Sequence, residues 1–279
     1  MQWIIGKYLV SEAGLRASDV IYAHAQPSPD AESLYSKICL HLHLAGHFAP
    51  PPDIAALFPK SRRTGSREAI RIDHARFSGE LTYDNAQRTG RFDLAANDPT
   101  AFSILLETCV SHCTAQDGGL LLHASGVVKD GRLFLFSGPS ESGKTTVAMS
   151  LRRNGTPFCV EATGLHIDES GTVVAYPTPL SDFEGEVPLR EPMPVHGIAF
   201  IQPSSSVSVT PMSPGAAAVS LLHNARYFFD DDADVSLLLG VATRIADGVT
   251  CVKMQFVKDE TFWDRLEDLL SNPQPTQGR

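Results

Sequence analysis

The sequence predicts an α/β fold in which a mixed sheet with flanking helices is preceded by a β-rich N-terminal region. After residue 118, apolar runs of strand length alternate with helical patterns. A glycine-rich loop follows one of these runs and leads into a helix, which is typical of α/β sheets that bind phosphate. Before residue 96 the chain holds short runs in which apolar and polar residues alternate. We therefore divide the chain into a β-rich region of unknown role, residues 1–96, and a phosphate-loop domain, residues 97–279.

The β-rich region contains three runs with a period of two: "EAIRIDHA", "GELTYD" and "GRFDLAA". These runs predict an antiparallel meander. An earlier stretch, "ESLYSKICLHLHLAG", is compatible with either a helix or a strand, because its periodicity does not decide between them. Its histidines, with a third at position 47, invite a metal site. No simple spacing gathers all three on one face, so we do not expect one.

The stretch "NDPTAFSILLETCVSHCTAQDGG" predicts a helix. Asp98 suits the N-cap, Pro99 suits the first helical position, and the glycine pair at 118–119 ends the pattern. We expect its apolar stripe to be buried, including two cysteines that pack in the core rather than form a thiol site. The stripe consists of Phe102, Leu105, Leu106, Cys109, Val110 and Cys113.

Strands and helices then alternate to the end of the chain. The runs "LLLHASGVV" and "RLFLFSG" predict two strands joined by a turn, followed by the loop and a helix over residues 144–154. "PFCVE" predicts a short buried strand, and "GLHIDESGTVVAYP" predicts a hairpin. The order continues with strands at "VHGIAFIQP" and "SVSVTPM" and with helices from about Ser213 and about Asp234. It ends with a strand "VTCVKMQFV" and a helix "DETFWDRLEDLL".

Composition excludes several classes of function. The net charge of −9 argues against a nucleic-acid partner or an anionic membrane surface, since both need clustered Lys and Arg. No run approaches the length of a membrane span, and the start lacks the pattern of a signal peptide. Five scattered cysteines do not suggest a disulfide framework. We expect a cytoplasmic protein with no membrane or nucleic-acid partner, and homo-oligomers are compatible with the sequence.

The loop matches the Walker A pattern G-x-x-x-x-G-K-[ST] at Gly138, Gly143, Lys144 and Thr145. Glycines let the backbone turn its N–H groups inward, and the helix that follows points its positive end at the same place. Lys144 can reach the β- and γ-phosphates, and the hydroxyl of Thr145 can bind Mg²⁺. The predicted nucleotide-binding residues are Gly138, Ser140, Glu141, Ser142, Gly143, Lys144, Thr145, Thr146 and, from a later segment, Arg190.

Phosphate transfer also needs a carboxylate that holds Mg²⁺ and a group that serves the acceptor. Such a carboxylate is expected at the carboxyl end of a strand beside the loop. Glu161 ends the predicted strand "PFCVE" and meets that expectation. The alternative is that Glu161 merely marks the end of the strand.

The segment "LLLHASGVVKDGRLFLFSGPSESGKTTVAMSLRRNG" resembles the catalytic domain of the HPr serine kinase/phosphorylase family, and above all its shorter bacterial kinase-like relatives. The resemblance spans about residues 118–270 and is strongest at 119–155 and at "AYPTP". In that family a histidine stands fifteen residues before the first glycine of the loop, as His123 does before Gly138. The family also has two adjacent acids seventeen and eighteen residues after the loop lysine. Here these positions hold Glu161 and Ala162.

The resemblance implies a fold like that of the phosphoenolpyruvate carboxykinase-like P-loop proteins. It also implies that the first acid serves the acceptor, with the histidine beside it, and that both acids help to hold the metal region. In this chain Glu replaces the first acid and the second is lost. The signature of the reverse phosphorolysis reaction is not evident, so we do not expect HPr phosphorylase activity. The N-terminal domain of the full-length enzymes is not recognisable in residues 1–115.

Groups that might replace the missing acid stand in "LSDFEGEVPLRE". They are Asp182, Glu184, Glu186 and Arg190, of which Arg190 could neutralise charge that develops on the transferred phosphoryl group. The alternative interpretation is a solvated connection between strands. The acidic run "FFDDDAD" is interpreted as the cap of the next helix, through Asp232 or Asp234.

The sequence thus predicts an ATP-dependent phosphotransferase that uses Mg²⁺ and acts on a hydroxyl, with a serine of a protein or peptide as the expected acceptor. Lys144 and the loop amides hold the phosphates, Thr145 and Glu161 bind the metal, and Glu161 with His123 serves the acceptor. One alternative is a nucleotide-binding module without transfer activity that acts as a scaffold or switch in a modification pathway. Another is a simple NTPase or a kinase for a small metabolite. The sequence identifies neither the acceptor nor the nucleotide preference.

Overall fold

The chain forms two compact units in the computed structural model. The first comprises Met1–Asp117 with Arg226–Ser236, and the second comprises Gly118–Ala225 with Leu237–Arg279. The domain boundary that the sequence suggests, between residues 96 and 97, stays a prediction. The structure describes residues 2–5, 8–13, 36–45, 60–63, 69–84, 87–95, 99–150, 155–177, 191–227, 232–257, 262, 263, 265 and 266.

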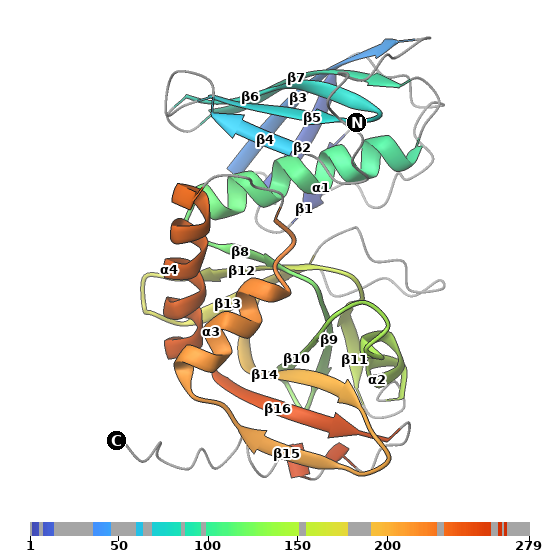
Figure 1. The fold of residues 1–279 in the computed structure, drawn as a ribbon, viewed down its shortest axis with the longest axis vertical. Coiled ribbons are helices and arrows are strands. Elements are labelled where there is room, and N and C mark those ends of the chain that lie inside the picture. The colour runs from blue at the N-terminus through green and yellow to red at the C-terminus, as the bar shows by residue number, and fades with distance from the viewer. Residues whose placement is uncertain are drawn as a thin grey trace. The chain divides into compact units, whose positions relative to one another are not determined.

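The first unit contains a seven-stranded sheet in the order β1-β2-β3-β7-β6-β5-β4 (Figure 1). The predicted meander is confirmed, because β5, β6 and β7 pair antiparallel in sequence order. The ambiguous stretch is a strand, β3, which pairs in parallel with β2 on one side and β7 on the other. The strands are β1 (Gln2–Ile5), β2 (Tyr8–Ala13), β3 (Ser36–Ala45), β4 (Lys60–Arg63), β5 (Ala69–His74), β6 (Phe77–Asp84) and β7 (Gln87–Ala95).

Helix α1 (Pro99–Gln116) contacts β6 and β7 of this sheet. It begins at Pro99, as the sequence predicts, whereas the proposed N-cap at position 98 lies outside the described residues. All six residues of the predicted apolar stripe are buried. Thr108, Ser111 and His112 are buried as well, so the helix is enclosed on more than its apolar side.

The second unit is an α/β structure built on a mixed sheet, which confirms the predicted fold class. Its strand order is β11-β9-β10-β14-β13-β12-β8, and β16 pairs with both β14 and β15. Strands β10, β14 and β16 run parallel, while the remaining pairs are antiparallel. The strands are β8 (Leu120–Leu122), β9 (Ala124–Lys129), β10 (Arg132–Ser137), β11 (Thr156–Cys159), β12 (Thr163–Ile167), β13 (Val173–Pro177), β14 (Met193–Pro203), β15 (Ser208–Pro211) and β16 (Thr250–Phe256).

Among the described residues after Gly118, the continuous helices are α2 (Lys144–Ser150), α3 (Pro214–His223) and α4 (Asp232–Gly248), and the first residues of α4 belong to the first unit (Figure 1). Ser213 caps α3, with its hydroxyl accepting a hydrogen bond from the N–H of Ala216 at 3.4 Å. The predicted helix over 144–154 is described as α2 up to Ser150. The closing helix is described only at 262, 263, 265 and 266.

Aromatic side chains fill the core around the strand that precedes the loop. Phe134 makes an edge-on contact with Trp263, with ring centroids 4.9 Å apart, and Phe136 makes one with Phe262. Phe256 at the end of β16 also packs edge-on against Phe262. Such contacts stabilise beyond the area they bury. They hold the parallel strands together at the edge where the loop begins.

One predicted strand differs in the structure. The run from 120 to 128 is interrupted at His123, which separates β8 from β9. The two pieces have different partners: β8 pairs with β12, and β9 pairs with β10 and β11. A change of partner requires a break in the ladder, and the sequence pattern gives no sign of it because both pieces are apolar. Within the described part of the chain, no helix is both long and apolar enough to cross a membrane.

The burial of the described thiols predicts that they do not react in the native protein. Cys109, Cys113, Cys159 and Cys251 are free and buried. Burial raises the pKa of the Cys251 thiol to about 12 and raises the pKa of Cys159 further. The reactive thiolate is therefore scarce. We expect these four to resist an aromatic disulfide reagent at about pH 8 until denaturant is added. Peptide mass spectrometry would show this, and native labelling of any of the four would contradict it.

Candidate functional site

The loop Gly138–Gly143 lies at the carboxyl edge of the parallel strands. It follows β10, whose neighbours β14 and β16 run in the same direction. A Cβ atom on Gly138 would lie 3.0 Å from the carbonyl oxygen of Ile201 in β14. A Cβ atom on Gly143 would lie 2.7 Å from Cζ of Phe256 in β16. The glycines therefore permit the loop to pack directly against both strands, at the edge where α/β sheets bind ligands.

Two loop residues have the left-handed backbone conformation. Gly143 has φ +92°, and Glu141 has φ 64°, which is uncommon for a residue with a side chain. The N–H of Ser142 donates to the carbonyl of Pro139 at 3.2 Å and closes the turn. Backbone conformations of this kind create concave nests of N–H groups that bind anions.

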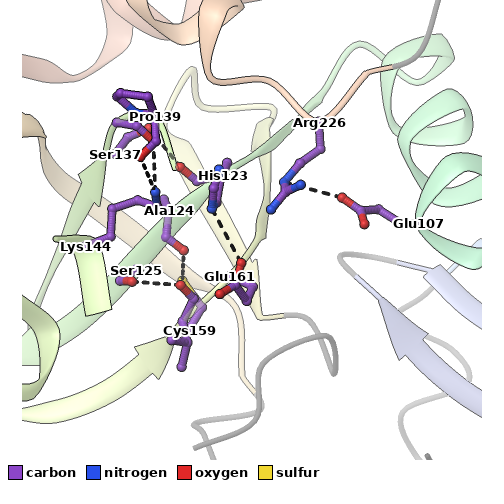
Figure 2. A network of polar contacts seen from close by, with 12 residues as sticks. Glu107, His123, Ala124, Ser125, Ser137, Pro139, Lys144, Cys159, Glu161 and Arg226 are labelled. Atoms are coloured by element: carbon purple, nitrogen blue, oxygen red, sulfur yellow. Dashed lines mark hydrogen bonds and ion pairs between the residues drawn. The ribbon is translucent and has the colours of Figure 1, made fainter. Parts of the chain in front are cut away.

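Lys144 directs its ammonium group into the loop. Its Nζ donates to the carbonyl oxygens of Gly138 at 3.0 Å and Pro139 at 2.8 Å, and the residue is buried (Figure 2). The hydroxyl of Ser142 is also buried and has no hydrogen-bond partner. Thr145 and Thr146, which follow, are exposed. A buried cation, an unsatisfied hydroxyl and two exposed hydroxyls form a donor set that fits a polyphosphate with its metal ion.

His123 and Glu161 lie against each other beside this loop, with His123 Nε2 3.4 Å from Glu161 Oε2, and a protonated imidazole would form an ion pair with the carboxylate (Figure 2). His123 occupies the break between β8 and β9, and Glu161 occupies the break between β11 and β12. Because β11 pairs with β9 and β12 pairs with β8, the two interruptions face each other. The His123 side chain is 13% exposed, and that of Glu161 is 51% exposed. A sheltered imidazole thus lies against a carboxylate that is half open to solvent.

Hydrogen bonds fix the backbone on both sides of this pair. The hydroxyl of Ser137, directly before Gly138, donates to the carbonyl of His123 at 2.9 Å, and the N–H of His123 donates to the carbonyl of Asn224 at 2.9 Å. Ser125 donates through its hydroxyl to the carbonyl of Val160 at 2.7 Å, next to Glu161. The sequence interpretation missed all three positioning residues. Ser137 and Ser125 could have been noticed as hydroxyls within apolar runs, whereas Asn224 gives no such signal.

Ala162 stands at the position where the HPr kinase family has its second acid, and its methyl group is buried. Ala162 is 1% exposed and is followed by Thr163, which is fully buried in β12. No group of three His, Cys, Asp or Glu side chains suited to a metal gathers among the described residues. Arg190 and its acidic neighbours Asp182, Glu184 and Glu186 lie outside them. Thr145 and Glu161 therefore remain the candidates for the metal.

Cys159 lies behind the pair and does not add a nucleophile. Its Sγ donates to the carbonyl of Ala124 at 3.5 Å. Desolvation raises the pKa of this thiol far above its usual range, against a smaller opposite effect of a hydrogen bond with Thr163. The thiol stays protonated at neutral pH. The chemistry at this point of the sheet is therefore that of the imidazole and the carboxylate.

A family model described as "SynChlorMet cassette protein ScmC" matches residues 100–270, more than half of the 279 residues of the chain. The chain belongs to the ScmC family. In this ScmC-family chain the matched segment includes the loop, His123 and Glu161. No curated protein matches the sequence.

Among solved structures, the chain is similar to the HPr(Ser) kinase/phosphatase from Coxiella burnetii. The sequence identity is 13%, the TM-score is 0.32, and the match covers 55% of this chain and 94% of the other. The similarity is distant, so the function of this ScmC-family chain is argued from its own residues.

The contact of Gly143 with Phe256 predicts a selective effect of substitution. Gly131 in the β9–β10 turn also has positive φ, +74°, but a Cβ atom there would meet nothing within 4 Å. Gly131→Ala should cost about 1–2 kcal/mol of unfolding free energy through its backbone conformation alone. Gly143→Ala should cost about 1–3 kcal/mol more, because Phe256 must move. Urea denaturation measures both, and equal losses would show that the contact has no energetic role.

Proposed function

We propose that this chain is an ATP-dependent phosphotransferase that acts on a hydroxyl, with a serine of a protein or peptide as its acceptor. One observation carries the proposal. The hydroxyl of Ser137, the last residue of β10 directly before the loop, donates to the backbone carbonyl of His123, and His123 lies against Glu161. The loop and the histidine–carboxylate pair are thereby both attached to the end of β10. A protein that only bound a nucleotide would need the loop but not the pair.

The loop supports binding of the nucleotide. The ammonium of Lys144 provides a buried positive charge next to the turn, where it would neutralise the β- and γ-phosphates. The hydroxyl of Thr145 and the carboxylate of Glu161 would hold Mg²⁺. When bound, that ion neutralises charge on the phosphates and helps to align them for transfer.

The pair supports transfer to an acceptor. Glu161 is half exposed, so an acceptor hydroxyl can approach its carboxylate from solvent. In the proposed step the hydroxyl oxygen bonds to the γ-phosphorus, the bond from that phosphorus to the bridging oxygen of ADP breaks, and Glu161 takes the hydroxyl proton. His123 would orient the carboxylate through its Nε2. The preference for serine in a protein or peptide is supported by the resemblance of the segment around the loop to HPr serine kinases. The composition supports action in the cytoplasm.

A second candidate function rests on Ala162. The methyl group at this position is buried, so among the described residues of the site the carboxylate of Glu161 would have to serve both the metal and the acceptor. A site with one acid can bind a nucleotide without transferring phosphate. The alternative is therefore a nucleotide-binding module that acts as a scaffold or switch in a peptide- or protein-modification pathway.

Transfer from γ-labelled ATP with Mg²⁺ to proteins and peptides encoded by neighbouring genes tests the proposal. Glu161→Gln should lower the rate of transfer by about 10²–10⁴-fold, because the proton acceptor is lost while the shape is kept. Lys144→Ala should lower nucleotide affinity and transfer together. Glu169→Gln, on the exposed β12–β13 turn, is the matched control and should leave both unchanged.

The two candidate functions differ in the outcome of this experiment. Transfer that Glu161→Gln and Lys144→Ala both abolish supports the phosphotransferase. ATP binding measured by calorimetry, with neither transfer nor hydrolysis and with no effect of Glu161→Gln, would overturn it in favour of the binding module.

A further inference from the structure

The loop Gly138–Gly143 carries an acidic side chain at a backbone position that suits glycine. Glu141 has φ 64°, in the left-handed region, where a side chain crowds the following carbonyl oxygen. Asparagine and aspartate tolerate this region better than glutamate, because their short side chains can bond to the local backbone. The other left-handed residue of the loop is a glycine, Gly143. The glutamate is therefore kept at a cost in stability, and the course of the backbone does not require it.

Glu141 lies on the side of the loop that faces solvent. The opposite side is packed, with Gly138 against β14 and Gly143 against β16. Residues 139–141 are exposed, as are Thr145 and Thr146 just after the loop. A polyphosphate would therefore approach from the side on which Glu141 stands. Within the described part of the chain, the carboxylate of Glu141 forms no hydrogen bond or ion pair with another residue.

Chain connectivity places the charge of Glu141 close to any phosphate that the loop binds. Two residues span at most about 7 Å, so the α-carbon of Glu141 stays within that distance of Gly143. Screening by salt at physiological ionic strength acts over about 8 Å, so the carboxylate still interacts with groups that the loop holds. The positive charge of Lys144 lies on the sheltered side, because its ammonium donates to the carbonyl of Gly138 and the residue is buried. A bound ligand would thus meet a cation on one side and a carboxylate on the other.

We propose that Glu141 is a specificity residue of the loop, whose carboxylate makes it bind a nucleoside triphosphate that carries its divalent cation in preference to the bare triphosphate. This inference rests on the proposed function for its ligand, but on binding alone and not on transfer. The carboxylate repels the phosphates of the bare triphosphate and attracts the cation of the complex. The buried methyl group of Ala162 provides no such charge. An acid within the loop supplies it in addition to Glu161.

Removing the charge and removing the side chain should have different effects. Glu141→Gln keeps the strained backbone but loses the charge, so the affinity for ATP without metal should rise about threefold to tenfold, while the affinity for Mg²⁺-bound ATP changes less. This gain should shrink at about 1 M salt, where screening is strong. Glu141→Gly should lose the same selection and also relieve the strain. Its equilibrium constant for folding should rise by about threefold, because the relief exceeds the entropy that glycine adds to the unfolded chain.

Asp130 provides the matched control. It is exposed, also has a left-handed backbone with φ 49°, and lies in the turn before β10, at the opposite end of that strand from the loop. Asp130→Asn removes the same charge and Asp130→Gly the same kind of backbone conflict. Calorimetry on the full chain measures the affinity for ATP in EDTA and in excess Mg²⁺, and urea denaturation without nucleotide measures stability. Neither measurement depends on phosphate transfer.

Weaker selection for Mg²⁺-bound ATP in both Glu141 variants, with greater stability in Glu141→Gly and unchanged selection in both Asp130 variants, supports the inference. The same result in a protein that transfers no phosphate supports it as well and contradicts only the proposed phosphotransferase. Unchanged selection in Glu141→Gln overturns the inference and leaves the function standing. An equal effect of Asp130→Asn also overturns it, because the net charge of the protein would then explain the result. A wild-type protein that binds ATP in neither buffer overturns both.

Discussion

The hydrogen bond from Ser137 to the carbonyl of His123 is the interaction on which the arrangement of the candidate site depends. Ser137 is the last residue of β10 and is fully buried, so its hydroxyl has no access to water and needs a protein partner. The carbonyl of His123 is available because the ladder of β8 and β9 is broken there. The same bond therefore satisfies the buried hydroxyl of Ser137 and fixes the backbone of His123 relative to the loop.

The position of the loop depends in turn on its packing against the ends of the parallel strands β14 and β16. A Cβ atom on Gly138 would lie 3.0 Å from the carbonyl oxygen of Ile201, and one on Gly143 would lie 2.7 Å from the ring of Phe256, so a side chain at either position would displace its neighbours. Phe256 is itself held edge-on by Phe262 in the core. The positions of the loop, of Lys144 and of Ser137 thus depend on the apolar core of the second unit. A substitution deep in this core can therefore displace the loop without touching it.

Local features of the site could be predicted from sequence, and features made by tertiary pairing could not. The loop was predictable because its glycines, lysine and flanking elements are contiguous and each has a local physical reason. The contact of His123 with Glu161 joins residues far apart in the chain, and the spacing of a known family, rather than periodicity, suggested it. The strand β3 remained ambiguous because its strand character depends on parallel pairing with β2 and β7. The contact of Asn224 with His123 depends on where α3 ends in space, which no local pattern encodes.

The charge at the site follows from the burial of Ala162. A carboxylate at this position would be almost fully excluded from water, and its desolvation would have to be offset by a metal ion or a cation. With alanine there, the protein folds without that cost. Glu161, being half exposed, needs no such compensation. In the proposed function, transfer would therefore depend on how well His123 orients the half-exposed carboxylate of Glu161.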